Sequence, residues 1–182
     1  MRTHPAENTH LYGFIDKTGA EVIEPQYEDA QSFSEGLALV RVDGKGSGYI
    51  DTAGTWAIEP RFQNAGDFSE GIAAVWADGG RGYIDKSGAW AIVPRFDEAG
   101  PFSEGLAVAG VAVRMPAYAG DDPCLYGYID TTGAWVIPPR YLRAAPFEGP
   151  LAQAWVDGRQ GYIDLTGEFV FSQPWEPPAH QK

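Results

Sequence analysis

The sequence has one cysteine, three histidines and no long apolar run, and each shortage excludes a class of protein. Cys124 alone cannot form an intramolecular disulfide or supply a thiolate-rich zinc site. His4, His10 and His180 lie in the terminal segments, so we expect neither a metal site nor a catalytic triad. No stretch approaches the ~20 apolar residues of a membrane helix, and residues 1–10 lack the apolar core of a secretory signal. We therefore expect a soluble, cytoplasmic protein that needs no cofactor.

Basic residues are also few, with 13 Lys and Arg against 25 Asp and Glu, and the formal net charge is -12. This charge would repel a phosphate backbone, which excludes nucleic acid as the expected partner. It would speed encounter with a basic partner protein, although solubility alone also explains it. Hydrophobic residues make up 44% of the 182 positions, enough for a folded body.

A tetrapeptide pattern of glycine, aromatic residue, isoleucine and aspartate recurs along the chain and indicates a tandem repeat. The intervals between successive copies are 35, 34, 45 and 34 residues, and the copies start at Gly13, Gly48, Gly82, Gly127 and Gly161. A second glycine follows six positions after each start. Two positions further on lies a large residue in four copies and a carboxylate in the first: Trp56, Trp90, Trp135, Phe169 and Glu21.

Further columns run through each copy. A proline column is followed two positions later by aromatic residues, Tyr27, Phe62, Phe96 and Tyr141, with Trp175 in the same place. Three copies then read Phe-Ser-Glu-Gly from Phe33, Phe68 and Phe102, whereas the fourth reads Phe147-Glu148-Gly149-Pro150.

These columns resemble the WG (KWG) repeat family, bacterial tandem β repeats with an aromatic-Gly-aromatic-Ile-Asp start, a glycine turn, an Ile-x-Pro step and a Phe-Ser-Glu-Gly. The likeness covers roughly Leu11 to Phe171. The tryptophan that precedes the first glycine in the family is replaced here by Tyr12, Ser47, Arg81, Tyr126 and Gln160. The resemblance implies a repeat scaffold and assigns no catalytic residues.

Each copy contains three segments with strand composition, as in Gly82–Asp85, Ala89–Val93 and Leu106–Ala109. The Asp-x-x-Gly link between the first two predicts a tight hairpin, because the aspartate can accept a backbone N–H bond and the glycine tolerates a positive φ. Asp-Gly pairs at 43–44, 78–79 and 157–158 predict a second hairpin, from the third strand into the next copy. The segment from Pro94 to Gly105 is expected to close the core from the side with inward Phe96 and Phe102.

One copy of ~34 residues cannot bury both faces of a small sheet, so neighbouring copies are expected to stack and share one interior. The prediction is an all-β array of about five antiparallel meander repeats over residues 11–173, between a polar leader at 1–10 and a proline-rich tail at 174–182. We favour an open or partly curled solenoid. A propeller-like ring is the alternative.

Residues that recur in every copy are expected to serve the architecture, because an active site is needed only once. The column Asp16, Asp51, Asp85, Asp130 and Asp164 is therefore interpreted as turn caps rather than as catalytic or calcium-binding carboxylates. Glu35, Glu70 and Glu104 are expected to be solvated or paired with Arg61, Arg95 and Arg140. Cys124 has no histidine near it in the repeat region and is interpreted as a passive thiol. No enzyme activity is predicted.

Departures from the repeat are more informative about function. The interval of 45 contains about eleven extra residues within 111–125, and insertions in repeat proteins form loops, often on the binding face. This insertion carries residue types that suit a partner interface: Arg114, Met115, Tyr118, Asp121 and Asp122. A neutral surface loop is the alternative.

Trp76 and Trp155 occupy a third-strand column where other copies have Arg41 and Gly110. Such optional aromatic residues can anchor a partner or stack on a sugar, or they can simply pack on neighbouring sheets. The leading hypothesis is a protein-binding repeat module, in a specific version an immunity or antitoxin-like inhibitor of a basic protein. The alternatives are a glycan or cell-wall binding module that uses Trp76, Trp155 and Trp175, and a structural scaffold without a dedicated ligand.

Overall fold

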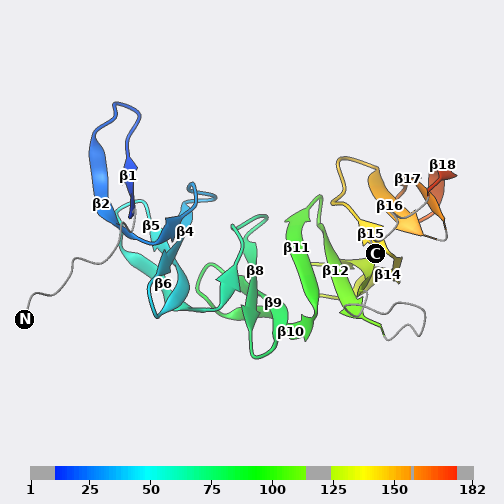
Figure 1. Ribbon diagram of the computed structural model, residues 1–182, viewed down its shortest axis with the longest axis horizontal. Helices are drawn as coiled ribbons and strands as arrows, with labels where there is room; N and C mark the ends of the chain where they lie inside the picture. The colour runs from blue at the N-terminus through cyan, green and yellow to red at the C-terminus, as the bar shows by residue number, and fades with distance from the viewer. Residues whose placement is uncertain (1–10, 114–123, 157, 176–182) are drawn as a thin grey trace, which may run out of the picture.

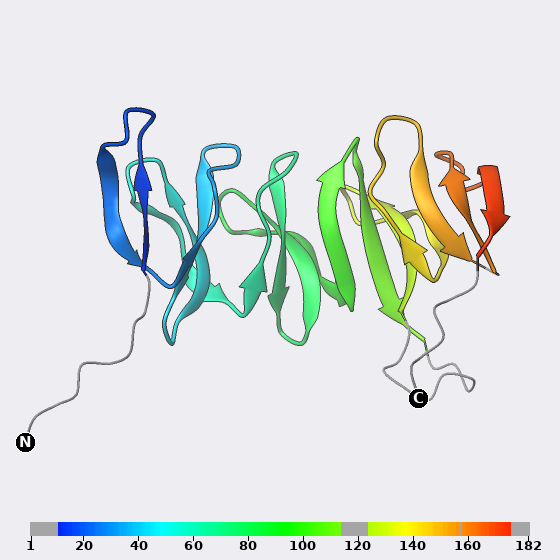
Figure 2. The same ribbon diagram turned by 45° about the horizontal axis from the view of Figure 1, so that its top comes forward.

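The computed structural model describes residues 11–113, 124–156 and 158–175, in which all regular structure is β-strand. No helix in these ranges could cross a bilayer. The strands form five antiparallel sheets that follow one another in a row (Figures 1 and 2). The first sheet holds β1 (Tyr12–Ile15) and β2 (Glu21–Tyr27), and the second holds β3 (Asp29–Ala30), β4 (Leu37–Val42), β5 (Gly46–Asp51) and β6 (Trp56–Phe62).

The remaining sheets repeat the arrangement of the second. The third holds β7 (Asn64–Ala65), β8 (Ile72–Ala77), β9 (Gly80–Asp85) and β10 (Trp90–Phe96). The fourth holds β11 (Glu98–Ser103), β12 (Leu106–Ala112), β13 (Cys124–Asp130) and β14 (Trp135–Tyr141), and the fifth holds β15 (Arg143–Ala144), β16 (Ala152–Val156), β17 (Arg159–Ile163) and β18 (Phe169–Pro174). The all-β meander predicted from the sequence is confirmed.

The sheets do not coincide with the sequence copies, and they contain a fourth strand that the sequence analysis missed. Each four-stranded sheet joins the third strand of one copy to the first two strands of the next, so that β8 pairs with β9. The linker expected to close the core from the side also supplies the extra strand, only two residues long in β3, β7 and β15. Pro94 lies inside β10 rather than after it, which is possible because β10 is an edge strand.

The Asp-x-x-Gly hairpins form as predicted. Asp85 Oδ1 accepts bonds from the backbone N–H of Ser87 at 2.9 Å and of Ala89 at 3.1 Å. Gly88, at the end of the turn, has a φ of 81°. In the second hairpin, Asp78 and Gly79 both adopt positive φ, as a two-residue reverse turn requires.

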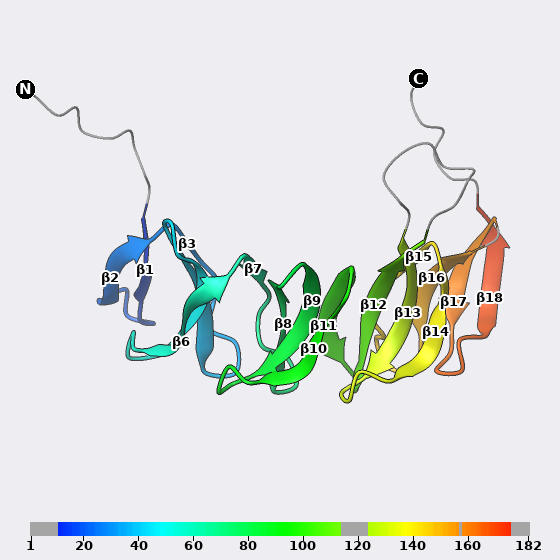
Figure 3. The ribbon, with the colours of Figure 1, turned by 90° about the horizontal axis from the view of Figure 1, so that it is seen from below.

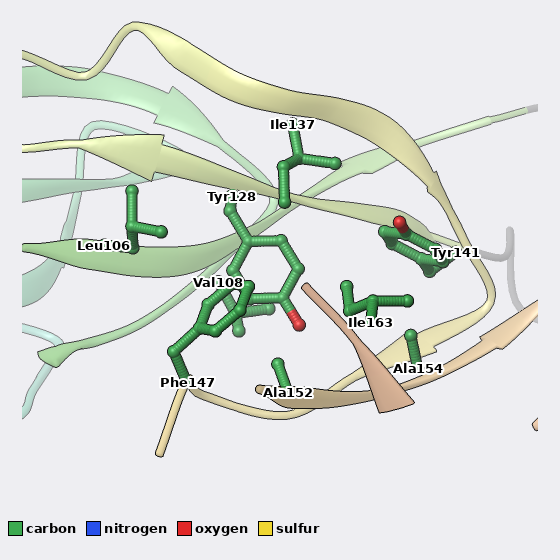
Figure 4. Packing of buried hydrophobic residues seen from close by; sticks show 9 residues of the cluster. All are labelled: Leu106, Val108, Tyr128, Ile137, Tyr141, Phe147, Ala152, Ala154 and Ile163. Atoms are coloured by element: carbon green, nitrogen blue, oxygen red, sulfur yellow. The ribbon is translucent and has the colours of Figure 1, made fainter. Parts of the chain in front are cut away.

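The sheets stack face to face and share their apolar side chains, as the repeat length predicts. Between the fourth and fifth sheets, Tyr128, Ile137 and Tyr141 pack against Ala152, Ala154 and Ile163 (Figure 4). Phe147 from the linker closes this junction, with its ring 4.7 Å from the Tyr128 ring. The same arrangement holds at the other junctions, so each four-stranded sheet has one face against its predecessor.

The Phe-Ser-Glu-Gly turns bond to each other in a chain that runs along the row. Ser69 Oγ donates to the Phe102 carbonyl at 2.7 Å, and the Glu70 carboxylate accepts the Gly105 N–H at 3.0 Å. Ser34 and Glu35 make the same contacts one repeat earlier. At the next step, position 150 holds a proline, which has no N–H to offer Glu104.

Glu35, Glu70 and Glu104 were expected to be solvated or paired with the repeat arginines, and the pairing alternative is wrong. Arg61 instead donates to the Gly88 carbonyl at 2.6 Å, and Arg95 and Arg140 bond the carbonyls of Gly133 and Gly167 in the same way. Each arginine also lies over the aromatic ring of the next residue. The arginines thus tie one sheet to the turn of the next.

The row is open. The first sheet and the fifth sheet lie at opposite ends, and the short strands β3, β7 and β15 run along one long side while β6, β10 and β14 run along the other (Figure 3). The described residues therefore form a solenoid-like row and not a closed ring.

The capped turns predict a loss of stability in acid. The hydroxyl of the residue two positions later, followed by backbone N–H groups, lowers the carboxyl pKa of Asp16, Asp130 and Asp164, and Ser87 acts likewise on Asp85. A lowered folded-state pKa gives stability that is complete above the unfolded value of about 3.9 and is lost as pH falls through the folded value. We expect the urea midpoint to be level from pH 7 to about 5 and to fall below pH ~4. A double Asp85→Asn, Asp130→Asn variant should show a shallower fall, whereas an equal fall in both proteins would contradict this origin.

Candidate functional site

The recurrent carboxylates do not form a chemical site. Each aspartate of the column caps its own turn through Oδ1. Among the described residues there is no group of three or more His, Cys, Asp or Glu side chains placed to hold a metal ion. Burial raises the pKa of the Cys124 thiol, and the nearby Asp97 and Glu98 carboxylates raise it further. A thiol kept protonated in this way is a weak nucleophile.

Trp76 lies near the end of β8 with 40% of its surface exposed. It belongs to the side of β8 that faces the fourth sheet, because the alternate residues Ala73 and Val75 are buried against the second. The Arg81 guanidinium lies over the indole ring, 5.5 Å from its centroid. Arg81 is in turn held by Glu98 of β11 at 3.1 Å. An exposed ring is thus fixed by an ion pair that joins two sheets.

A groove of about 400 Å3 opens beside this cluster, between the third and fourth sheets. Its apolar lining comes from both sheets, with Ala74 on one side and Ala99 and Pro101 on the other. Polar residues also line it, among them Asn64, Asp67 and Ser69. The groove therefore combines apolar residues, the Trp76 ring and a few polar residues, which is the usual composition of a binding site.

The base of the insertion lies next to the groove. Glu98 pairs with Gly110 of β12, and the β12–β13 hairpin ends at the pair Ala112 and Cys124, from which the insertion leaves. The Ala112 N–H donates to the Asp97 carboxylate at 2.8 Å, which ties this base to the strand that lines the groove. The expected partner-binding residues of the insertion, Arg114, Met115, Tyr118, Asp121 and Asp122, lie outside the described residues. Their interpretation stays a prediction.

The structure does not bring Trp76 and Trp155 together. Trp155 occupies the equivalent position in β16, two sheets away, where it is half-buried and its Nε1 donates to Gln160 Oε1 at 2.8 Å. It lines a separate hollow of about 200 Å3 on the outward side of the fifth sheet. Trp175 follows β18 and is held by a bond from its N–H to the Gly158 carbonyl.

The residues that accompany Trp76 were not predicted from the sequence. Arg81 and Glu98 lie on different strands of different sheets, so no sequence spacing links them. One signal in the sequence could have pointed to Arg81. Position 81 falls in the column where the family has tryptophan, and the copy that starts at Gly82 is the only one with arginine there.

The sequence profile of the WG containing repeat matches residues 12–45, 48–76, 82–110 and 126–158. The chain belongs to this family. No curated protein matches the sequence. Among solved structures, a crystal structure of the computationally designed Ika8 protein is similar, with 13% identity and a TM-score of 0.53. The alignment covers 87% of this chain and 54% of the designed one, so the chain spans about half of that protein's length.

Membership of the WG repeat family accounts for the stacked sheets. The groove lies where this chain departs from the repeat pattern. The stretch between the third and fourth matched repeats, residues 111–125, is the insertion, and its base at Ala112 and Cys124 is tied to Asp97 just before β11. Trp76 stands at the last matched position of the second repeat, in the column where the first has Arg41 and the third Gly110. Trp76 and the base of the insertion in this WG repeat protein therefore both lie at the junction of the third and fourth sheets.

Proposed function

We propose that this chain is a non-enzymatic protein-binding module, which takes a segment of a partner protein into the groove between its third and fourth sheets. The observation that carries the proposal is Trp76, an exposed ring held by Arg81 at the rim of the groove. Exposed tryptophan and arginine side chains are the residue types that most often dominate binding energy at protein interfaces. The insertion that leaves from the same junction adds contact surface in this proposal.

The finer proposal is an immunity or antitoxin-like inhibitor that covers a basic protein. It is supported by the net charge of -12, which would raise the association rate with a basic partner at low salt. The Asp67 carboxylate places part of this charge at the groove itself.

Replacing Trp76 with alanine should weaken partner binding by at least about tenfold, because the ring would be the central anchor of the contact. The measurement is affinity capture from extracts of the source cells, followed by titration of the purified partner at low and high salt. Val93→Ala is the matched control, since Val93 is exposed on β10, which forms the edge of the same sheet opposite β7.

Equal binding by wild type and Trp76→Ala would remove the groove from the proposal. A partner whose affinity does not depend on salt would contradict only the basic-partner version. A separate Tyr118→Ala, Asp121→Ala, Asp122→Ala variant tests the sequence prediction for the insertion.

A further inference from the structure

The outward face of the fifth sheet exposes side chains whose counterparts are covered everywhere else. Tyr162 is 41% exposed and Phe171 is 57% exposed. The equivalent tyrosines of the internal sheets are fully buried and the equivalent isoleucines nearly so: Tyr49, Tyr83, Tyr128, Ile58, Ile92 and Ile137. In the described residues, no sixth sheet lies against Tyr162 and Phe171. The fifth sheet thus presents two adjacent aromatic rings to solvent.

Glutamines surround these rings at positions where the internal sheets carry other residues. Gln153 stands where the earlier sheets have Leu39, Ala74 and Val108, and Gln173 stands where they have Pro60, Pro94 and Pro139. Gln160 takes the position of Ser47, Arg81 and Tyr126. Three amides under another sheet would each need hydrogen-bond partners, and burying them without partners costs free energy. The face is therefore poorly suited to stacking on a second copy of the chain.

Two of the amides are already oriented. Gln153 Nε2 donates to the Tyr162 hydroxyl oxygen at 3.0 Å, and Gln160 Oε1 accepts the Trp155 Nε1–H at 2.8 Å. Each bond uses one end of the amide, so Gln153 keeps a free Oε1 acceptor and Gln160 keeps free Nε2 donors. Tyr162 also retains its own O–H to donate. Directed donors and acceptors consequently stand around the exposed rings.

These groups line the hollow of about 200 Å3 that contains Trp155, Tyr162 and Phe171, and none of its lining residues is charged. An uncharged lining is unusual in a chain of net charge -12 and selects against ionic ligands. Aromatic faces accept the apolar C–H face of a sugar ring, while amide and hydroxyl groups pair with its hydroxyls. We infer that this terminal face binds a neutral sugar, one ring at a time in the hollow, as part of a longer glycan.

This site is independent of the proposed protein-binding groove, because the two lie on different sheets and share no lining residue. The test uses the full chain, titrated by calorimetry with neutral hexasaccharides of glucose and of N-acetylglucosamine, with polygalacturonate as an anionic comparison. At least one neutral hexasaccharide should bind. Phe171→Ala and Gln160→Ala should each weaken it, the first by about tenfold through loss of stacking.

Val170→Ala is the matched control, because Val170 is as exposed as Phe171 on the same strand and does not line the hollow. It should bind like wild type, and so should Trp76→Ala, which separates this inference from the proposed function. Absence of binding to every neutral hexasaccharide at millimolar concentration would overturn the inference, as would tighter binding of polygalacturonate. A wild-type dimer in sedimentation that becomes a monomer in Phe171→Ala would also overturn it and would assign the face to a second copy.

Discussion

Replacing Gly82 with alanine should lower the free energy of unfolding by about 3 kcal/mol or more, since the new methyl group has no space and its neighbours cannot move. A Cβ at this position would lie 2.5 Å from the Ile92 carbonyl oxygen and 2.8 Å from the Pro94 nitrogen. Both are backbone atoms of the adjacent strand β10, so relief requires β9 and β10 to separate. The measurement is urea unfolding followed by tryptophan fluorescence.

Gly80→Ala is the matched control for this prediction. Gly80 lies on the same strand, two residues earlier, and its added Cβ would meet nothing closer than 3.5 Å. Alanine there should change the free energy of unfolding by about 1 kcal/mol or less. The change can be a stabilisation, because alanine lowers the conformational entropy of the unfolded chain. If both variants unfold at the same urea concentration, the close approach of β9 and β10 is not the reason for the recurrent glycine.

Replacing Phe102 with alanine should cost about 3–5 kcal/mol, because the side chain is a fully buried ring at a junction between sheets. Phe102 is 2% exposed, and its ring contacts that of Tyr83 edge-on with 4.9 Å between the centroids. It belongs to the cluster that joins the third and fourth sheets. Stability in a repeat array is a sum over neighbouring units, so this loss should weaken the coupling between the two halves of the row.

We therefore expect Phe102→Ala to unfold in two steps, with fluorescence and circular dichroism transitions that no longer coincide. Phe33→Ala serves as the control. Phe33 makes the equivalent contact with Phe14 but is only half-buried, at the junction with the two-stranded first sheet. Its loss should be smaller and should leave the main transition cooperative. A single coincident transition with a small shift in Phe102→Ala would show that the junction contributes little.

Local features of this fold were predictable because their causes lie within a few residues. An aspartate that caps its own turn, as Asp85 does, needs only the N–H groups two and four positions later. The Asp78-Gly79 hairpin likewise follows from the conformations that these two residues tolerate. The recurrence of both turns at a spacing of ~34 residues was enough to predict stacked β repeats.

The errors arose where partners come from different repeats. The two-residue strands β3, β7 and β15 are too short to show any alternation of apolar and polar residues, so the fourth strand of these three sheets left no pattern. Glu70 was expected to be solvated or paired with an arginine, yet its carboxylate accepts the Gly105 N–H of the following turn. Such contacts join positions about 35 residues apart, and only the stacking of the sheets sets which groups meet.

For the candidate sites, the sequence indicated individual residues, whereas their proximity depends on how the sheets pack. The sequence marked Trp76, Trp155 and the 111–125 insertion as departures from the repeat, but it could not say which of them lie close together. Arg81 and Glu98 meet beside Trp76 only because the third sheet packs on the fourth. Gln153 and Gln160 surround exposed rings only because the fifth sheet has no neighbour among the described residues.

The sequence by itself determined the repeat, its turns and the all-β class, because a turn is decided by the conformational freedom and the side-chain donors of adjacent residues. Only the tertiary structure decided which apolar columns are buried, which carbonyl each arginine reaches and where a groove remains open. Those outcomes depend on the distance and angle between neighbouring sheets, and packing between residues far apart in the chain sets that geometry.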